Sequence, residues 1–208
     1  MKIRNCRLVT SSPTLELAPP PAGPDFAIIG RSNVGKSSLI NILLNRKIAH
    51  TSNTPGKTRL MNFYLVNEVP PGGKPWRDGP TLTLVDLPGY GFAKVARTER
   101  EMWDRRMRDF MLERESLALV LHLIDARHGP QPNDEDMNDW LLGNDVRRQV
   151  VLTKTDKISK AAVAKVLDQT RIMLKLSDSH PPLPFSAEAR EGTEQLWKVL
   201  LEALSIPR

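Results

Sequence analysis

At 208 residues, with 40% hydrophobic and 26% charged residues, the chain has the composition of a globular protein large enough to bury one core. Its single cysteine, Cys6, excludes an intramolecular disulfide, and we expect a cytoplasmic protein without membrane contact because no signal-peptide-like segment and no run of about 20 apolar residues is present. The net charge of +6 favours an acidic partner, of which RNA is the commonest.

The first predicted elements follow a proline-rich segment. Residues 1–24 end in "APPPAGP", and prolines interrupt regular structure, so we expect a stiff lead-in there. The apolar run "DFAIIG" predicts a strand, and "KSSLINILLN" predicts a helix because its leucines recur at helical spacing. "RLMNFYLV" and "TLTLV" predict two strands of a hairpin, joined by a long loop rich in proline and glycine.

Helices and apolar strands alternate in the rest of the chain. We predict helices at about residues 98–114 and 159–176, and at "NDEDMNDWLL" and "GTEQLWKVLLEAL". "LALVLHLI", "RQVVL" and "PLPF" predict strands. Together, residues 25–208 are expected to form one three-layer α/β domain, with helices on both faces of a six-stranded, mostly parallel sheet that has one antiparallel hairpin.

A phosphate-binding loop lies between the first predicted strand and its helix. "GRSNVGKSS" matches Gly-x-x-x-x-Gly-Lys-Ser at Gly30, Gly35, Lys36 and Ser37. Glycines let backbone amides face phosphates, Lys36 can reach the β and γ phosphates, and the Ser37 hydroxyl can bind Mg²⁺. The motif predicts a P-loop NTPase, although it does not identify the base.

Two later segments predict guanine as the base. In "TKTD", the Asp156 carboxylate can accept hydrogen bonds from the guanine N1–H and exocyclic amine, and the Lys154 stem would pack on the base. GTPases usually begin this motif with asparagine, which Thr153 replaces here. "FSA", at 185–187, follows the last predicted strand, so its backbone amides could meet the guanine O6.

Two segments have the pattern of nucleotide-sensing switches. In "DLPGYG", we expect Asp86 to bind Mg²⁺ through a water and the Gly89 amide to contact the γ-phosphate. Tyr90 stands where many GTPases have the glutamine that orients the attacking water, so intrinsic hydrolysis should be slow. The other switch must supply a threonine to Mg²⁺, and the spacing of "TSNTPGKTRLMNFY" leaves Thr54 and Thr58 equally possible.

These motifs, in this order, resemble the EngB (YihA or YsxC) family of bacterial GTP-binding proteins, within the TrmE-Era-EngA-like GTPase superfamily. "GRSNVGKSSLIN", "TPGKTRLMNFY", "DLPGYGFAKV", "TKTDK" and "FSA" carry a resemblance that covers nearly the whole chain. It implies a Ras-like G domain that binds GTP, GDP and Mg²⁺. It also implies a role in assembling the large ribosomal subunit, with precursor RNA and proteins as partners, and in normal division-septum formation. We expect a monomer.

The resemblance also assigns residues. It favours Thr58 over Thr54 as the Mg²⁺ ligand beside Ser37. The nucleotide contacts that it implies are Gly30, Arg31, Ser32, Asn33, Val34, Gly35, Lys36, Ser37, Gly56, Lys57, Thr58, Arg59, Leu60, Asp86, Leu87, Pro88, Gly89, Thr153, Lys154, Thr155, Asp156, Phe185, Ser186 and Ala187. Catalytic roles are expected for Lys36, Gly89 and Asn33. This P-loop resembles those of potassium-activated GTPases, whose corresponding asparagine binds K⁺. Hydrogen bonds that cap the loop are the other interpretation of Asn33.

Some alternatives stay open from the sequence. The arginine-rich helix at about 98–114 has interleaved acids, so it can form ion pairs within itself or contact ribosomal RNA phosphates. Trp103, Met107 and Phe110 recur at helical spacing and are expected in the core. Two other functions share part of the pattern: a GTPase module of a tRNA-modification system, and a P-loop phosphotransferase that acts on a small molecule.

Overall fold

The computed structural model describes residues 1–49, 60–76, 79–90 and 97–205, without the side chains of 97–100 and 103. Its elements are β1 (Cys6–Ser12), β2 (Asp25–Gly30), α1 (Lys36–Leu44), β3 (Met61–Val66), β4 (Leu82–Asp86), α2 (Arg97–Glu113), β5 (Leu117–Asp125), α3 (Pro132–Gly143), β6 (Arg148–Thr153), the 3₁₀ turn η1 (Thr155–Lys157), α4 (Lys160–Met173), β7 (Leu183–Pro184) and α5 (Thr193–Leu204). Every helix and strand predicted after residue 24 is present, with ends that differ by a few residues.

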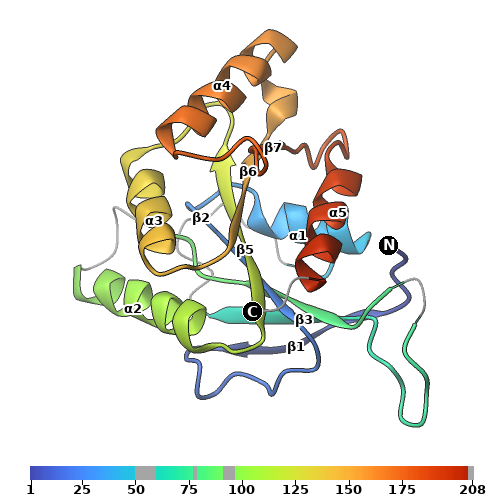
Figure 1. The fold of residues 1–208 in the computed structure, drawn as a ribbon. Coiled ribbons are helices and arrows are strands. Elements are labelled where there is room, and N and C mark those ends of the chain that lie inside the picture. Colours follow the sequence, from blue (N-terminus) through green and yellow to red (C-terminus); the bar gives the residue numbers. More distant parts are fainter. Residues whose placement is uncertain (50–59, 77–78, 91–96, 206–208) are drawn as a thin grey trace.

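The strands form one sheet in the order β1-β3-β4-β2-β5-β6-β7 (Figure 1). β2 pairs in parallel with β4 on one side and β5 on the other, and β6 and β7 continue the parallel part. β3 and β4 form the predicted antiparallel hairpin. The mostly parallel α/β fold is therefore confirmed, with seven strands where the sequence predicted six.

The additional strand lies in the predicted lead-in. β1 pairs antiparallel with β3, so the expectation that residues 1–24 lack regular structure is wrong at Cys6–Ser12. β1 is an edge strand that keeps most of its side chains at least partly exposed, and it therefore lacks the apolar pattern of the buried strands. The proline run begins only after this strand. The division of the chain at residue 24 stays a prediction.

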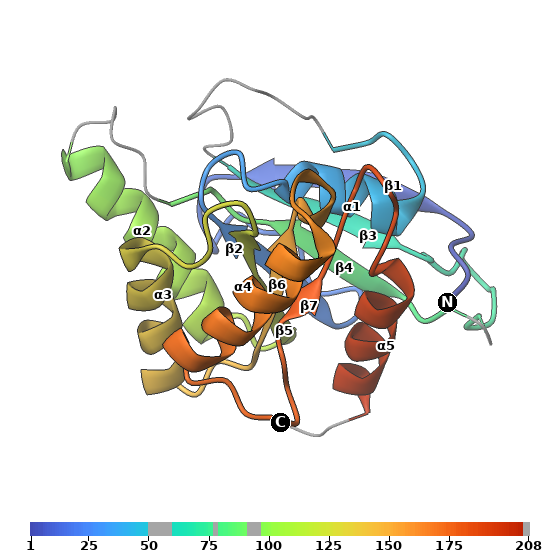
Figure 2. The same cartoon turned by 90° about the horizontal axis from the view of Figure 1, so that it is seen from above.

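Helices cover both faces of the sheet (Figure 2). Strand β2 shows why, because its side chains alternate: Phe26 and Ile28 pack in the cluster that includes α1 and α5, whereas Ala27 and Ile29 pack in the cluster that includes α2 and α3. Met107 and Phe110 of α2 are buried in the latter cluster, as predicted. No helix in the described ranges combines the length and apolar character that crossing a membrane requires.

A buried ion pair joins the end of α2 to the start of β2. The Nε atom of Arg114 lies 2.6 Å from Oδ2 of Asp25, and these side chains are 9% and 0% exposed. Ser116 donates a 2.5 Å hydrogen bond to the same carboxylate oxygen, and Arg114 also donates to the carbonyl of Pro19. The pair therefore anchors the strand that leads into the P-loop.

Replacing Arg114 should destabilise the protein strongly. Arg114→Ala leaves the Asp25 carboxylate buried without its partner, and we expect a loss of about 3–5 kcal/mol in the free energy of unfolding. Urea denaturation measures this loss. The matched control is Arg171→Ala, which removes the two exposed ion pairs of this α4 residue with Asp168 and Asp178 and should cost less than about 1 kcal/mol. Equal losses in the two variants would contradict a structural role for the buried pair.

Candidate functional site

The P-loop spans the gap between β2, which ends at Gly30, and α1, which begins at Lys36. The Val34 amide donates to the Arg31 carbonyl, and Gly35 caps α1 with φ of 112°, in the left-handed region that favours glycine. The positive end of α1 attracts phosphate. Residues 30–37 thus have the predicted strand–loop–helix geometry.

The predicted γ-phosphate sensor lies against this loop. A Cβ atom added to Gly89 would be 3.1 Å from Nζ of Lys36 and 3.2 Å from the Ser32 amide nitrogen, closer than side chains usually pack, so glycine favours this close approach of the chain. Lys36 is 9% exposed, with its ammonium group at the meeting point of the P-loop and the end of β4. The structure therefore brings together two of the three residues for which catalytic roles were predicted.

Asp86 completes a buried pair of opposite charges with Lys36. Burial lowers the pKa of Lys36, although the negative charge of Asp86 opposes this shift. Burial likewise raises the pKa of Asp86, against the effects of the Lys36 charge and a 3.4 Å hydrogen bond from the Ser37 hydroxyl. Each charge partly compensates the desolvation of the other, which favours keeping both ionised beside a charged ligand.

The side chains of Asp86 and Ser37 have the chemistry of a Mg²⁺ site. Oδ1 of Asp86 is buried and has no hydrogen-bond partner in the described part of the chain, and the Ser37 hydroxyl is beside the same carboxylate. Hard oxygen ligands of this kind, one direct and one acting through water, suit Mg²⁺. The described residues contain no cluster of three or more histidine, cysteine, aspartate or glutamate side chains for another metal. Gly56, Lys57, Thr58 and Arg59, and the alternative Thr54, lie outside the described residues.

The base-reading loop is bonded directly to the P-loop. The Thr153 hydroxyl lies 2.7 Å from the Val34 carbonyl oxygen and 3.2 Å from that of Ile124. Nζ of Lys154 donates to the Asn33 carbonyl at 2.5 Å and to Asp125 at 2.8 Å. Although Thr153 replaces the usual asparagine, its hydroxyl therefore still joins the two loops.

The two segments predicted to read guanine are also in contact with each other. Ser186 donates a 2.6 Å hydrogen bond to Oδ1 of Asp156, and the Thr155 amide donates to the Phe185 carbonyl. The Ser186 bond is the main cause that lowers the pKa of Asp156, so this carboxylate is ionised at neutral pH and can accept two guanine donors. The sequence predicted only backbone contacts from this last segment, and the side-chain role of Ser186 was missed.

Asp125 is a second site residue that sequence reasoning missed. It accepts hydrogen bonds from Lys154 and Arg127, and these outweigh the effect of burial and lower its pKa to about 2. Asp125 therefore stays charged and positions the lysine that is expected to cover the base. Its place at the carboxyl end of β5 could have revealed it, because ligands of parallel sheets bind at that edge.

Tyr90 lies in the core and does not take the role of the missing glutamine. Its side chain is 6% exposed, and its hydroxyl is 2.6 Å from Nε2 of His122 and donates to Asp134 at 2.8 Å. Since the one phenolic proton goes to Asp134, His122 must donate through Nε2. Burial lowers the pKa of His122 to about 3, so its ring is neutral. These bonds tie the residue after the γ-phosphate sensor to β5 and α3.

Other residues that were predicted to contact the nucleotide lie in the core or form backbone hydrogen bonds. Leu87 is fully buried and donates its amide to Ile28, so its side chain belongs to the core. Arg31 forms a backbone bridge with Tyr90, and Val34 is 3% exposed. Leu60 is 38% exposed just before β3. The side chain of Trp103 lies outside the described residues.

A strand–P-loop–helix unit, a buried acidic residue at the end of the neighbouring strand and an aspartate-bearing base loop define a P-loop protein of the GTPase class. The model of a family described as "50S ribosome-binding GTPase" matches residues 25–154. The probable GTP-binding protein EngB of Pelotomaculum thermopropionicum is 44% identical over 203 residues, which cover 96% of each chain. That of Kosmotoga olearia is 44% identical over 183 residues, 88% of this chain and 90% of the relative. This chain therefore belongs to the EngB family of GTP-binding proteins, and it is a GTPase.

Solved structures agree on the fold. The crystal structure of a probable GTP-binding protein engB has a TM-score of 0.66 at 22% identity and covers 86% of this chain and 98% of that one. The structure of Era in complex with MgGDPNP and nucleotides 1506–1542 of 16S ribosomal RNA has a TM-score of 0.72 at 24% identity, over 89% and 58% of the two chains. At these identities, the likeness concerns the fold alone.

Removing the Thr153 hydroxyl should weaken nucleotide binding. Thr153→Ala breaks the hydrogen bonds to Val34 and Ile124, and we expect GDP affinity to fall about tenfold, equivalent to one or two hydrogen bonds. Isothermal titration calorimetry measures the affinity. Thr153→Ser keeps the hydroxyl and should retain most of it. Equal losses in both variants would show that the hydroxyl does not join the loops.

Removing the Tyr90 hydroxyl should affect stability more than catalysis. Tyr90→Phe removes the buried hydrogen-bond partner of His122 Nε2 and of Asp134 Oδ1, so the free energy of unfolding should fall by about 1–3 kcal/mol. Single-turnover GTP hydrolysis by folded protein should change less than about threefold. Tyr64→Phe is the control, since the Tyr64 hydroxyl has no hydrogen bond to a described residue. A loss of hydrolysis of about a hundredfold in Tyr90→Phe alone would assign the phenol to catalysis.

Proposed function

We propose that this GTPase is a cytoplasmic, GTP-gated factor that binds the precursor of the large ribosomal subunit during assembly. The observation that carries the gating is the position of Gly89, against Lys36 and the P-loop amide of Ser32. A third phosphate that lies against Lys36 meets the Gly89 amide, whereas a diphosphate does not reach it. The family description, which names 50S ribosome binding, supports the choice of partner.

Hydrolysis by this site depends on positioning and charge. Lys36 and the P-loop amides neutralise and orient the phosphates, and the Asp156 carboxylate selects guanine. Ser37, and Asp86 through a water, would hold Mg²⁺, which would supply further charge neutralisation beside the phosphates. Because Tyr90 points into the core, no described side chain takes the place of the water-orienting glutamine. Intrinsic turnover is therefore slow and open to stimulation by a partner or by K⁺.

The Asn33 side chain is available for a cation. It is exposed and makes no hydrogen bond to a described residue, while the Asn33 carbonyl holds Lys154. This gives the capping interpretation of the side chain no support. We expect GTP hydrolysis to be faster in KCl than in NaCl at matched ionic strength, and Asn33→Ala to abolish the difference. Equal rates in the two salts, with and without large subunits, would exclude potassium activation.

The experiment that tests the function is co-sedimentation with purified ribosomal subunits. The protein is compared with a non-hydrolysable GTP analogue, with GDP and without nucleotide. Enrichment on the large subunit only with the analogue supports the proposal. Lys36→Ala, which lacks the phosphate-binding ammonium, is the negative control and should not be enriched. Absence of association in every state, at low and physiological salt, would overturn the proposal.

A role in division is expected to follow indirectly from ribosome assembly. On depletion of the protein, precursors of the large subunit should therefore accumulate before septa become abnormal. The reverse order would argue for a direct role at the septum. The alternative of a GTPase module in a tRNA-modification system gains no support from relatives named GTP-binding proteins that match over 96% of both chains.

A further inference from the structure

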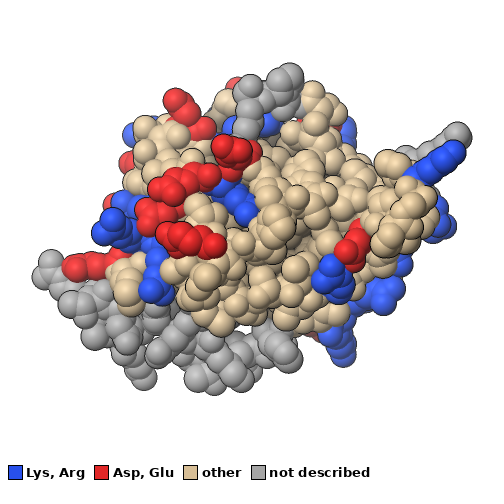
Figure 3. Space-filling view, turned by 90° about the horizontal axis from the view of Figure 1, so that it is seen from below, with Lys and Arg blue, Asp and Glu red and all other residues tan. Residues whose placement is uncertain are grey.

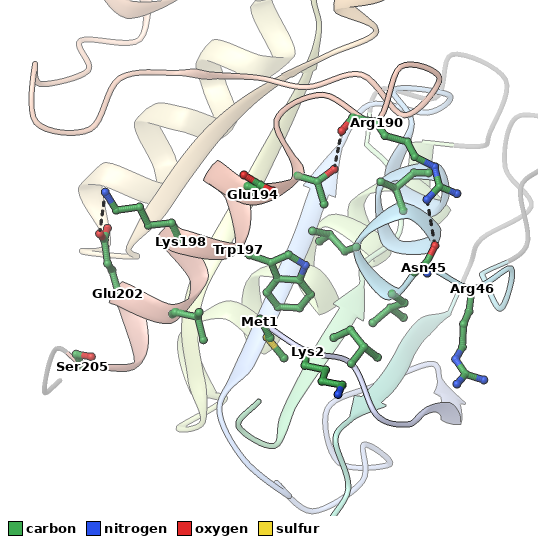
Figure 4. Close-up of a pocket in the computed structure, with 16 residues that line it drawn as sticks. Met1, Lys2, Asn45, Arg46, Arg190, Glu194, Trp197, Lys198, Glu202 and Ser205 are labelled. Atoms are coloured by element: carbon green, nitrogen blue, oxygen red, sulfur yellow. Dashed lines mark hydrogen bonds and ion pairs between the residues drawn. The ribbon is translucent and has the colours of Figure 1, made fainter. Parts of the chain in front are cut away.

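A broad groove lies between α5, the end of α1 and the N-terminal residues (Figure 4). Its volume is about 1330 Å³. Pockets for small molecules usually have about 300–1,000 Å³. The groove is therefore better suited to a segment of a polymer than to a metabolite.

The lining of the groove combines an apolar floor with a basic rim. The apolar surface comes mainly from the half-buried Ile42 of α1 and Leu201 of α5, while Leu43 and Trp197 also line the groove but are almost fully buried. The basic residues are Lys2, Arg46, Arg190 and Lys198, and all four are exposed. Figure 4 shows the Trp197 ring at the centre, with Arg46 and Arg190 toward α1 and the acidic Glu194 and Glu202 along α5. The positive charge is thus concentrated on the side formed by α1 and the N-terminal residues.

Most of this positive charge has no acidic partner among the residues that the structure describes. Lys198 is 3.9 Å from Glu202, and Arg190 donates to the uncharged Asn45. Within the described ranges, none of Lys2, Arg46 and Arg190 lies within ion-pair distance of a carboxylate. Free cations around an apolar surface are expected where a polyanion binds.

The arginine-rich helix α2, the other basic candidate, has partners of its own. Arg105 lies 3.9 Å from Asp109, and the Arg108 guanidinium stacks on the Trp140 ring at 5.0 Å. On the face seen from below in Figure 3, acidic and basic side chains are mixed at the end that holds α2 and α3, while basic ones predominate at the opposite end, beside the β3–β4 hairpin. Among the described side chains of α2, Arg105 therefore supports pairing within the helix and Arg108 is held by α3, which leaves the groove as the better candidate for RNA.

We propose that the groove between α1, α5 and the N-terminal residues binds a single-stranded segment of RNA. Phosphates lie along Lys2, Arg46 and Arg190, and bases cover the apolar floor. An acidic peptide has the same charge but lacks the flat apolar surfaces that bases offer. The identity of the RNA as ribosomal rests on the proposed function.

The position of the groove links it to the nucleotide site. Helix α1 carries Lys36 at its first residue and ends at Leu44, which lines the groove. On the other side, Arg190 follows the segment that positions Asp156. The groove is therefore built on the two segments that follow the P-loop and the Phe185–Ala187 segment.

RNA binding by the full chain can be tested with a fluorescent uridine oligomer of about 12 nucleotides, by anisotropy over a series of KCl concentrations. Lys2→Glu/Arg46→Glu should weaken binding at least about tenfold and reduce the slope of log affinity against log salt by about 1.4, since two phosphate contacts are lost. Neither side chain has a hydrogen bond to a described residue, so thermal stability and GTP hydrolysis should be unchanged.

The matched control is Lys160→Glu/Lys165→Glu, which changes the net charge equally on exposed positions of α4. It should leave the affinity within about twofold of the unsubstituted protein, apart from a long-range electrostatic effect that high salt removes. Equal weakening in the two double variants would overturn the proposal, because it would show that only the overall charge matters. Tighter binding of a glutamate oligomer of equal charge than of the uridine oligomer would also overturn it, in favour of an acidic peptide.

Co-sedimentation separates the failure of the groove from the failure of the proposed function. If the unsubstituted protein and Lys2→Glu/Arg46→Glu bind large subunits equally, the groove proposal fails and the assembly function stands. In a second outcome, the unsubstituted protein binds no subunit, but it binds the uridine oligomer and the groove variant does not. The assembly function then fails and RNA binding by the groove stands. Loss of subunit binding in the groove variant alone supports both.

Discussion

The parallel pairing of β2 with β4 and β5 is the constraint on which the rest of the structure depends. Its register sets Ile28 beside Asp86, and the next pair along the sheet sets Asp125 beside Thr153. Parallel strands end at the same edge, so the P-loop, the switch aspartate and the base loop all emerge there. Without this register, motifs more than a hundred residues apart in the chain would not meet around one nucleotide.

Two adjacent residues that follow β4, Gly89 and Tyr90, have different roles. The backbone at Gly89 lies over the P-loop, where an added Cβ would crowd the Lys36 ammonium group. The next side chain, Tyr90, turns into the core and bonds to His122 and Asp134. The predicted contact with the third phosphate therefore belongs to the backbone, while the position that orients water in many GTPases serves packing. This arrangement fits the proposed factor, which responds to the nucleotide and hydrolyses it slowly.

The nucleotide site and the proposed RNA groove use charge in different ways. In the nucleotide site, Lys36 and Asp86 are buried, and each opposes the effect of desolvation on the other. Around the groove, Lys2, Arg46 and Arg190 are exposed and have no acidic partner among the described residues. The first arrangement favours one ligand held in a fixed geometry, and the second favours a flexible polyanion whose binding depends on salt.

Some of these features could be predicted from the sequence because they depend on residues that are close together in the chain. The P-loop, "DLPGYG" and "TKTD" each combine a strand end with a fixed spacing, so their chemistry and their common edge could be predicted. The strand β1 could not, because an exposed edge strand has no apolar pattern and exists through its pairing with β3. The bonds of Tyr90 to His122 and Asp134, and of Ser186 to Asp156, join residues about 30 to 44 positions apart. The sequence by itself determined the nucleotide, the class of fold and the glycine that we predict to sense phosphate. Only the tertiary structure decided which side chains support that site and which basic side chains have no acidic partner among the described residues. Both depend on distances between residues far apart in the sequence, and these distances are set only when the chain folds.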